Sequence, residues 1–136
     1  MCIKTLEEET IKSLEIAKQC ARLAKDKRAI EPIILDVKGL SDVASFFVIC
    51  HGISSTQIKT IADYIVERLA GKGELPLHIE KDRENKWIII DFVDVMVHIF
   101  DSESRDYYRL EQLWGDARKI KFRRSPGAGK QAKKKT

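Results

Sequence analysis

Apolar residues follow two kinds of pattern that alternate along the chain. Over 5–25 and 54–70 they recur every three or four positions, which predicts two amphipathic helices with one buried stripe each. Both stretches begin with a capping box, in which Ser or Thr is followed three residues later by Glu or Gln. These pairs are Thr5 with Glu8 and Ser54 with Gln57. Gly71 follows the second stretch and is a typical residue after a helix end.

Short runs rich in β-branched and aromatic residues predict five strands. They lie at 33–37, 46–50, 76–80, 87–92 and 95–100. The third run has the weakest pattern, and the brief connection between the last two predicts an antiparallel hairpin. A third helix is expected over Glu103–Trp114, with Asp101 or Ser102 as its cap. The order αββαβββα is typical of a single α/β (α+β) domain, in which helices pack on a mixed five-stranded sheet.

Composition narrows the class of protein. The chain has 136 residues, and its 43% hydrophobic and 34% charged content is typical of one soluble globular domain. No apolar stretch approaches the roughly 20 residues of a membrane-spanning helix. The N-terminal region carries an acidic run at 7–9 and lacks the pattern of a signal or transit peptide, so we expect a cytoplasmic location. The three cysteines have no Cys-x-x-Cys spacing, which fits a reducing compartment.

The charge is divided unevenly along the chain. The segment 118–136 holds nine basic residues and no acidic one, which leaves 16 basic against 21 acidic residues in 1–117. The nine are Arg118, Lys119, Lys121, Arg123, Arg124, Lys130, Lys133, Lys134 and Lys135. Such a segment buries too little apolar surface to fold alone and is attracted to polyanions. We therefore expect a folded domain over 1–117 and a disordered basic tail over 118–136 that contacts RNA.

Patterns that could carry catalysis or hold a metal are incomplete. The loop 52–56 lies between a strand and a helix, but it lacks the glycine spacing and the lysine of a phosphate-binding loop. Asp91 and Asp94 stand three residues apart across a turn, a poor arrangement for a magnesium pair. Cys50 and His51 are strand neighbours that point to opposite faces, which disfavours both zinc binding and a nucleophilic pair. We expect no catalytic residue, metal or cofactor.

Aromatic residues gather near the end of the predicted domain. They are Trp87, Phe92, Tyr107, Tyr108 and Trp114. Rigid amphipathic side chains of this kind dominate binding hot spots, although any one of them can equally belong to the core. On the third helix, Tyr107 shares an apolar stripe with Trp114, whereas Tyr108 lies about 100° away and is the better surface candidate.

Five ordered blocks carry a resemblance to a known family. They are LDVKGLSD (35–42), FVICHGISS (47–55) with QIKTIAD (57–63), WIIIDF (87–92), DVMVHIF (94–100) and SRDYYRLEQLW (104–114). Together they resemble the Iojap, or ribosomal silencing factor (RsfS), family over roughly residues 6–116. The resemblance implies a fold distantly similar to nucleotidyltransferases but without their catalytic acids.

The same resemblance implies a non-enzymatic function. Family members bind the large ribosomal subunit through large-subunit ribosomal protein number fourteen and sterically block the small subunit, which represses translation. The docking face implied for this chain comprises Trp87, Phe92 and Tyr108, with Asp91 and Asp94 orienting the hairpin and adding polar contacts. Homodimers of the free protein are implied as well. The basic tail lies outside the shorter family pattern, and we expect it to contact ribosomal RNA.

Two other functions remain open on the sequence alone. A phosphoryl-transfer enzyme would need metal-dependent nucleotide turnover that disappears when Asp91 or Asp94 is changed. A general RNA-binding module would bind arbitrary RNA through the tail and would be insensitive to Trp87→Ala.

Overall fold

The computed structural model describes residues 6–41, 44–108, 115 and 117–122, with only the backbone described for 6–10 and 106–108. Its elements follow the order αββαβββαβ. They are α1 (Leu6–Asp26), β1 (Ile30–Asp36), β2 (Phe46–Gly52), α2 (Ser55–Ala70), β3 (His78–Lys81), β4 (Trp87–Asp91), β5 (Val95–Asp101), α3 (Ser102–Tyr108) and β6 (Arg118–Ile120). Thr5, which was expected to cap the first helix, lies outside the described residues.

The strands form one mixed sheet in the order β3-β4-β5-β2-β1-β6. β2 and β5 run parallel, with Val48 opposite Val97, and the other neighbouring pairs are antiparallel. The predicted hairpin is confirmed, because β4 and β5 pair antiparallel with Ile89 opposite His98. The expected fold class, a single α+β domain with a mixed sheet and packed helices, is also confirmed.

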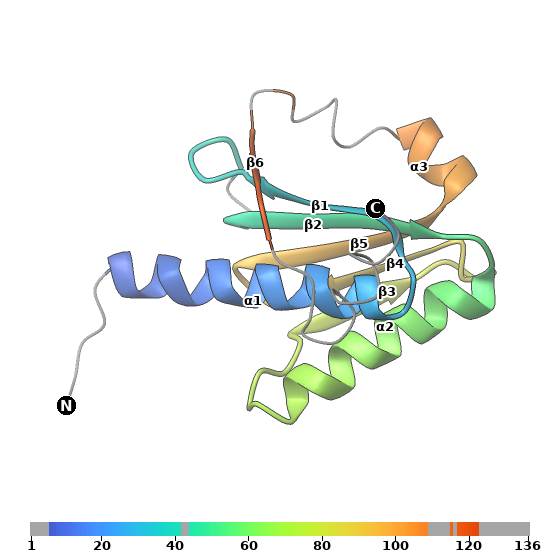
Figure 1. Ribbon diagram of the computed structural model, residues 1–136, viewed down its shortest axis with the longest axis horizontal. Coiled ribbons are helices and arrows are strands. Elements are labelled where there is room, and N and C mark those ends of the chain that lie inside the picture. The colour runs from blue at the N-terminus through green and yellow to red at the C-terminus, as the bar shows by residue number, and fades with distance from the viewer. Residues whose placement is uncertain (1–5, 42–43, 109–114, 116, 123–136) are drawn as a thin grey trace, which may run out of the picture.

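Two helices cover one face of the sheet, which we call the helix-covered face (Figure 1). α1 contributes four fully buried small residues, which let its backbone approach the sheet closely: Ala17, Cys20, Ala21 and Ala24. α2 contributes the apolar stripe Ile58, Ile61, Ile65 and Leu69, also fully buried. Burial of each such Ile or Leu side chain contributes about 1.5–3 kcal/mol. The helical periodicity in the sequence therefore identified the surfaces that form the main core.

The opposite face carries a smaller apolar cluster, and we call it the α3 face because α3 lies on that side (Figure 1). Its buried members are Leu35, Val37, Ala44, Phe47, Ile49 and Phe100. Four partly buried residues pack against this cluster: Ile33, Trp87, Met96 and Ala117. Both faces are thus apolar at the centre of the sheet, which explains why β2 is apolar at five successive positions.

Ser54 caps α2 as expected, whereas the reciprocal bond of the predicted capping box goes to Ile53, one residue before the cap. Ser54 Oγ accepts a hydrogen bond from the Gln57 backbone N at 3.1 Å, and Gln57 Oε1 accepts one from the Ile53 backbone N at 2.7 Å. Gln57 Nε2 also donates to the carbonyl oxygens of Lys27 and Arg28, at 3.2 and 3.1 Å. Gln57 therefore joins the start of α2 to the connection between α1 and β1.

Within the described residues the sheet has six strands, one more than the five expected from the sequence. β6 pairs antiparallel with β1, with Ile34 opposite Ile120, and it includes residues that the sequence assigned to the basic tail. Arg118 Nη2 lies 3.3 Å from Asp36 Oδ2, so one of the basic side chains forms an ion pair with the domain. Ile120 and Phe122 pack against the main core. The prediction of a disordered tail rested on the positive charge of the segment 118–136 and did not take Ile120 and Phe122 into account.

The third helix begins as expected. Asp101 Oδ1 accepts a hydrogen bond from the Ser104 backbone N at 2.7 Å, which caps α3. Residues 109–114, over which the helix was expected to continue, lie outside the described residues. None of the three described helices combines the length and the apolar character needed to cross a membrane.

Candidate docking surface

Trp87 stands at the first position of β4, at one end of the α3 face. It lies opposite Phe100 on β5 and packs, partly buried, against the smaller apolar cluster. Because side chains alternate along a strand, Ile89 and Asp91 share its face, opposite His98 and Met96 respectively. Trp87, Ile89, Asp91 and Met96 are all partly exposed, and we call these four residues the docking surface.

Phe92 does not belong to this surface, which corrects the grouping implied by the sequence. Its side chain is 8% exposed and lies in the core beneath α1 and α2. Trp87 and Phe92 are five positions apart, an odd separation, so the pleat directs them to opposite faces of the sheet. The structure brings Trp87 and Asp91 together and places Phe92 in the core.

The carboxylates of the two acidic residues at the hairpin accept hydrogen bonds from different parts of the chain. Asp91 Oδ1 accepts a hydrogen bond from the Val93 backbone N at 2.7 Å, and Val93 adopts a φ of 78°, which is unusual for a β-branched residue. Asp94 Oδ2 accepts a hydrogen bond from Ser13 Oγ of α1 at 3.2 Å. The two carboxylates therefore bind different partners. Within the described part of the chain, no three His, Cys, Asp or Glu side chains are grouped to hold a metal.

Tyr108 is the last residue of α3, and its side chain lies outside the described residues. The position of α3 depends on Arg105, which sequence reasoning missed. The Arg105 side chain is 6% exposed, and its Nη1 lies 3.1 Å from the Ile30 carbonyl oxygen and 3.0 Å from His51 Nδ1. These contacts fix the start of α3 against the ends of β1 and β2.

His98 is a second residue that sequence reasoning passed over. Its side chain is 7% exposed, with the Phe47 ring edge-on at 5.0 Å and the Phe100 ring stacked at 6.1 Å between centroids. Neither ring nitrogen has a hydrogen-bond partner among the described residues. Burial lowers the pKa of His98 to about 4, so the imidazole is neutral at physiological pH.

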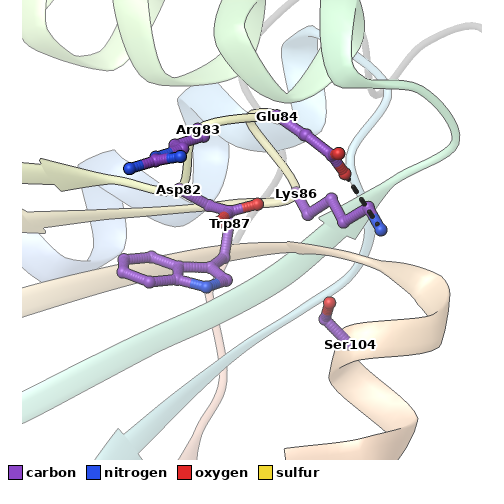
Figure 2. A pocket seen from close by; sticks show the side chains of 6 residues that line it. All are labelled: Asp82, Arg83, Glu84, Lys86, Trp87 and Ser104. Carbon is purple, nitrogen blue, oxygen red and sulfur yellow. Dashed lines mark ion pairs between the residues drawn. The ribbon is translucent and has the colours of Figure 1, made fainter.

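A shallow polar pocket borders Trp87 on the side of the β3–β4 turn (Figure 2). Its lining comprises Asp82, Arg83, Glu84, Lys86, Trp87 and Ser104, the last contributed by α3. Lys86 Nζ lies 3.1 Å from Glu84 Oε1, and this hydrogen bond raises the pKa of Lys86. Charged side chains of both signs therefore lie on one side of the indole, as in the polar rim of a protein interface.

The thiols in the described part of the chain are not poised for chemistry. Cys20 and Cys50 are fully buried in the main core, and burial raises the pKa of both, to about 12 for Cys50. A thiol in such surroundings stays protonated and is a poor nucleophile. His51, its neighbour in sequence, contacts Arg105.

Taken together, these features describe an α+β domain with a partly buried tryptophan on an apolar sheet face and charged side chains beside it. A family model described as "Ribosomal silencing factor during starvation" matches residues 10–136. The chain belongs to this family of ribosomal silencing factors. The family suggested by the five sequence blocks is thereby confirmed.

Individual relatives agree with this assignment. The chain is 42% identical over 102 residues to ribosomal silencing factor RsfS of Bacillus subtilis (strain 168), which covers 75% of this chain and 86% of that protein. It is 32% identical over 115 residues to the chloroplastic protein Iojap of Arabidopsis thaliana, covering 85% of this chain and 48% of that one. The crystal structure of protein CV0518 from Chromobacterium violaceum superposes with a TM-score of 0.73 at 28% identity, covering 85% and 95% of the two chains.

Proposed function

We propose that this protein binds the large ribosomal subunit through the α3 face and sterically blocks the small subunit, which represses translation. The observation that carries the proposal is the placement of Trp87, half-buried among apolar side chains and bordered by charged ones. Tryptophan in such a setting is the residue type most often found at binding hot spots. The family to which the chain belongs supplies the ribosome as the target.

The docking partner in this proposal is large-subunit ribosomal protein number fourteen. Trp87 is its anchor, Asp91 offers a polar contact on the same face, and Tyr108 contributes from the end of α3. Asp94 has a different role, because its carboxylate accepts the hydrogen bond from Ser13. Phe92 supports the hairpin from the core.

The proposal is tested by sedimentation with separated ribosomal subunits, followed by a subunit-joining assay. The protein should co-migrate with the large subunit and reduce the yield of joined ribosomes. Trp87→Ala should weaken large-subunit binding by about 2 kcal/mol or more while the fold is retained. Leu75→Ala is the matched control, because Leu75 is 70% exposed and lies outside the docking surface. Equal loss in both variants, or no loss in either, would refute docking through Trp87.

The free protein forms a homodimer in this proposal, and the β3 edge offers a surface for it. β3 pairs only with β4 among the described strands, so its outer side is open. Leu77 is 71% exposed and Ile79 37% exposed along this edge, and an open edge with apolar side chains favours strand pairing with a second chain. Leu77→Lys should shift sedimentation toward the monomer, and an unchanged profile would exclude this edge.

Two other functions were left open by the sequence, a phosphoryl-transfer enzyme and a general RNA-binding module. Ribosomal silencing factors are non-enzymatic ribosome-binding proteins, which overturns the alternative of a phosphoryl-transfer enzyme. Contact of the basic tail with ribosomal RNA is part of our proposal, and binding to arbitrary RNA that survives Trp87→Ala would instead favour a general RNA-binding module. Bacterial and organellar proteins both occur among the relatives, and we propose a cytoplasmic location for this chain.

A further inference from the structure

Val93 lies at the tip of the β4–β5 hairpin in a backbone conformation that its residue type disfavours. Its φ of 78° falls in the left-handed region, and the Asp94 backbone N donates a hydrogen bond across it to the Phe92 carbonyl oxygen, at 3.0 Å. A three-residue turn closed in this way, with a positive φ at its centre, is rare and strained. A branched Cβ adds to the strain, whereas glycine or asparagine tolerates the same φ more easily.

Neighbouring residues hold Val93 in this conformation. Asp91 Oδ1 accepts a hydrogen bond from the Val93 backbone N at 2.7 Å, and the Phe92 backbone N donates to the Val95 carbonyl oxygen at 2.8 Å. The Phe92 side chain is itself anchored in the main core. A strained backbone persists only where its surroundings fix it so thoroughly, and such positions gather at functional sites.

The Val93 side chain does little to offset the strain within the domain. It is 56% exposed, and it belongs to neither apolar cluster of the described residues. Single exposed apolar residues are common on protein surfaces, so exposure alone carries no argument. The combination of an exposed apolar side chain with a strained and firmly held backbone is what distinguishes Val93 and points to a contact outside the domain.

Val93 adjoins the docking surface. Its backbone N is bonded to the carboxylate of Asp91, a member of that surface, and Met96 lies opposite Asp91 on β5. Val93 comes six positions after Trp87, which is at most about 20 Å of extended chain. A standard protein interface covers about 800 Å² of each partner and is thus roughly 30 Å across. One docked protein can therefore cover Trp87 and Val93 together.

We infer that Val93 is a contact residue for the docked ribosomal protein, against which its side chain packs through an apolar patch of that partner. This inference rests on the proposed function, because the partner must cover both the α3 face and the hairpin tip. Trp87 and Val93 then mark the two ends of one interface, with Asp91 between them. Docking removes the valine from water, and the fixed turn presents its side chain with little entropy left to lose on binding.

Two substitutions at this position test the inference in the full chain, by thermal melting and by large-subunit binding. Val93→Asn suits the positive φ and removes the apolar side chain. It should melt at an equal or higher temperature and bind the large subunit at least fivefold more weakly. Val93→Ile is the matched control, because it keeps both the strain and a branched apolar side chain. It should bind as tightly as the original chain.

The results of these measurements separate the inference from its alternatives. A lower melting temperature of Val93→Asn would overturn it, because the valine side chain would then support the fold. Binding weakened equally in Val93→Ile would overturn it as well, since the partner would then recognise the shape of the turn. Unchanged binding by Val93→Asn, with binding lost in Trp87→Ala, would exclude Val93 and leave the proposed function intact. Unchanged binding in Val93→Asn and Trp87→Ala would remove the proposed function itself.

Two further readouts distinguish an apolar docking contact from other roles of Val93. Sedimentation of free Val93→Asn should match that of the original chain, and a shift toward the monomer would instead assign Val93 to self-association and overturn the inference. The loss of large-subunit binding in Val93→Asn should be the same at low and high salt, because salt screens charges and not apolar contacts. A loss that disappears at high salt would contradict an apolar contact.

Discussion

The hydroxyl of Ser13 on α1 donates a hydrogen bond to Asp94 Oδ2 in the β4–β5 turn, at 3.2 Å. Ser13 is 5% exposed and Asp94 lies in the exposed turn, so the bond joins a buried side chain of the helix to the turn. Asp94 also accepts hydrogen bonds through its carbonyl oxygen from the backbone N of Ser45 and Phe46, at 2.8 and 3.1 Å. A single residue thus connects the first helix, the start of β2 and the hairpin.

A double-mutant cycle of Ser13→Ala and Asp94→Asn measures this connection. We expect each single change to lower the free energy of unfolding, with a coupling of about 1 kcal/mol because the carboxylate is partly solvated. Urea denaturation gives these values. Large-subunit binding should remain unchanged in Asp94→Asn, and a selective loss of binding would instead make Asp94 a contact residue.

The stability of the protein should depend on pH through His98. Burial lowers its pKa to about 4 from the ordinary value of 6.5, so the unfolded chain takes up a proton between these values while the folded chain does not. Stability is therefore lost as the pH falls from about 6.5 to about 4, by roughly 3 kcal/mol from this group. Urea denaturation across this range measures the slope. His98→Phe should remove this part of the slope, and an identical slope in that variant would assign it to other groups.

The start of α2 should tolerate loss of its cap better than loss of Gln57. Ser54→Ala removes one hydrogen bond and should cost about 1 kcal/mol of unfolding free energy. Gln57→Ala removes the bonds to Ile53, Lys27 and Arg28, and we expect a larger loss of about 2 kcal/mol.

Lys59→Ala is the control on the same helix. Its ion pair with Asp63, 2.8 Å long, is solvent-exposed, and its loss should cost about 0.5 kcal/mol or less. Chemical denaturation ranks the three variants. Equal losses for Ser54→Ala and Gln57→Ala would show that the bonds to the α1–β1 connection contribute nothing.

The basic tail should make large-subunit binding sensitive to salt. A chain ending at Phe122 keeps β6 and removes six of the nine basic residues beyond position 117. Each phosphate contact adds about −0.7 to −0.9 to the slope of log K against log salt concentration, so the shortened chain should show a shallower slope. Binding measured across a salt series tests this. An unchanged slope would mean that the removed segment makes no phosphate contacts.

Local patterns predicted much of the fold because the forces behind them are local. The box at Ser54 and Gln57 fixed the start of α2, and the two apolar runs on either side of Asp94 fixed the hairpin. β6 escaped prediction because three residues rich in positive charge form a strand only when Ile34 and its neighbours provide a partner.

The candidate site was predicted less completely. Trp87 was selected by its residue type and is partly exposed on the α3 face. Phe92 was grouped with it, but the Phe92 side chain is buried on the helix-covered face, as the odd spacing between the two residues indicates. Arg105 and His98 could not be found in this way. Their contacts are with a backbone carbonyl of β1 and side chains of β2, and no local pattern records that arrangement.

The pairing of β1 with β6 also has a consequence for how the chain acquires its structure. Asp36 and Arg118 are 82 residues apart, and β2 must find β5 across α2, β3 and β4 to form the parallel pair. Contacts of such long range slow folding, because a large loop must close before any stabilisation is gained. During synthesis, the sheet cannot be completed until β6 has left the exit tunnel. Of the described strand pairings, that of β1 with β6 is therefore the last that can form as the chain is synthesised.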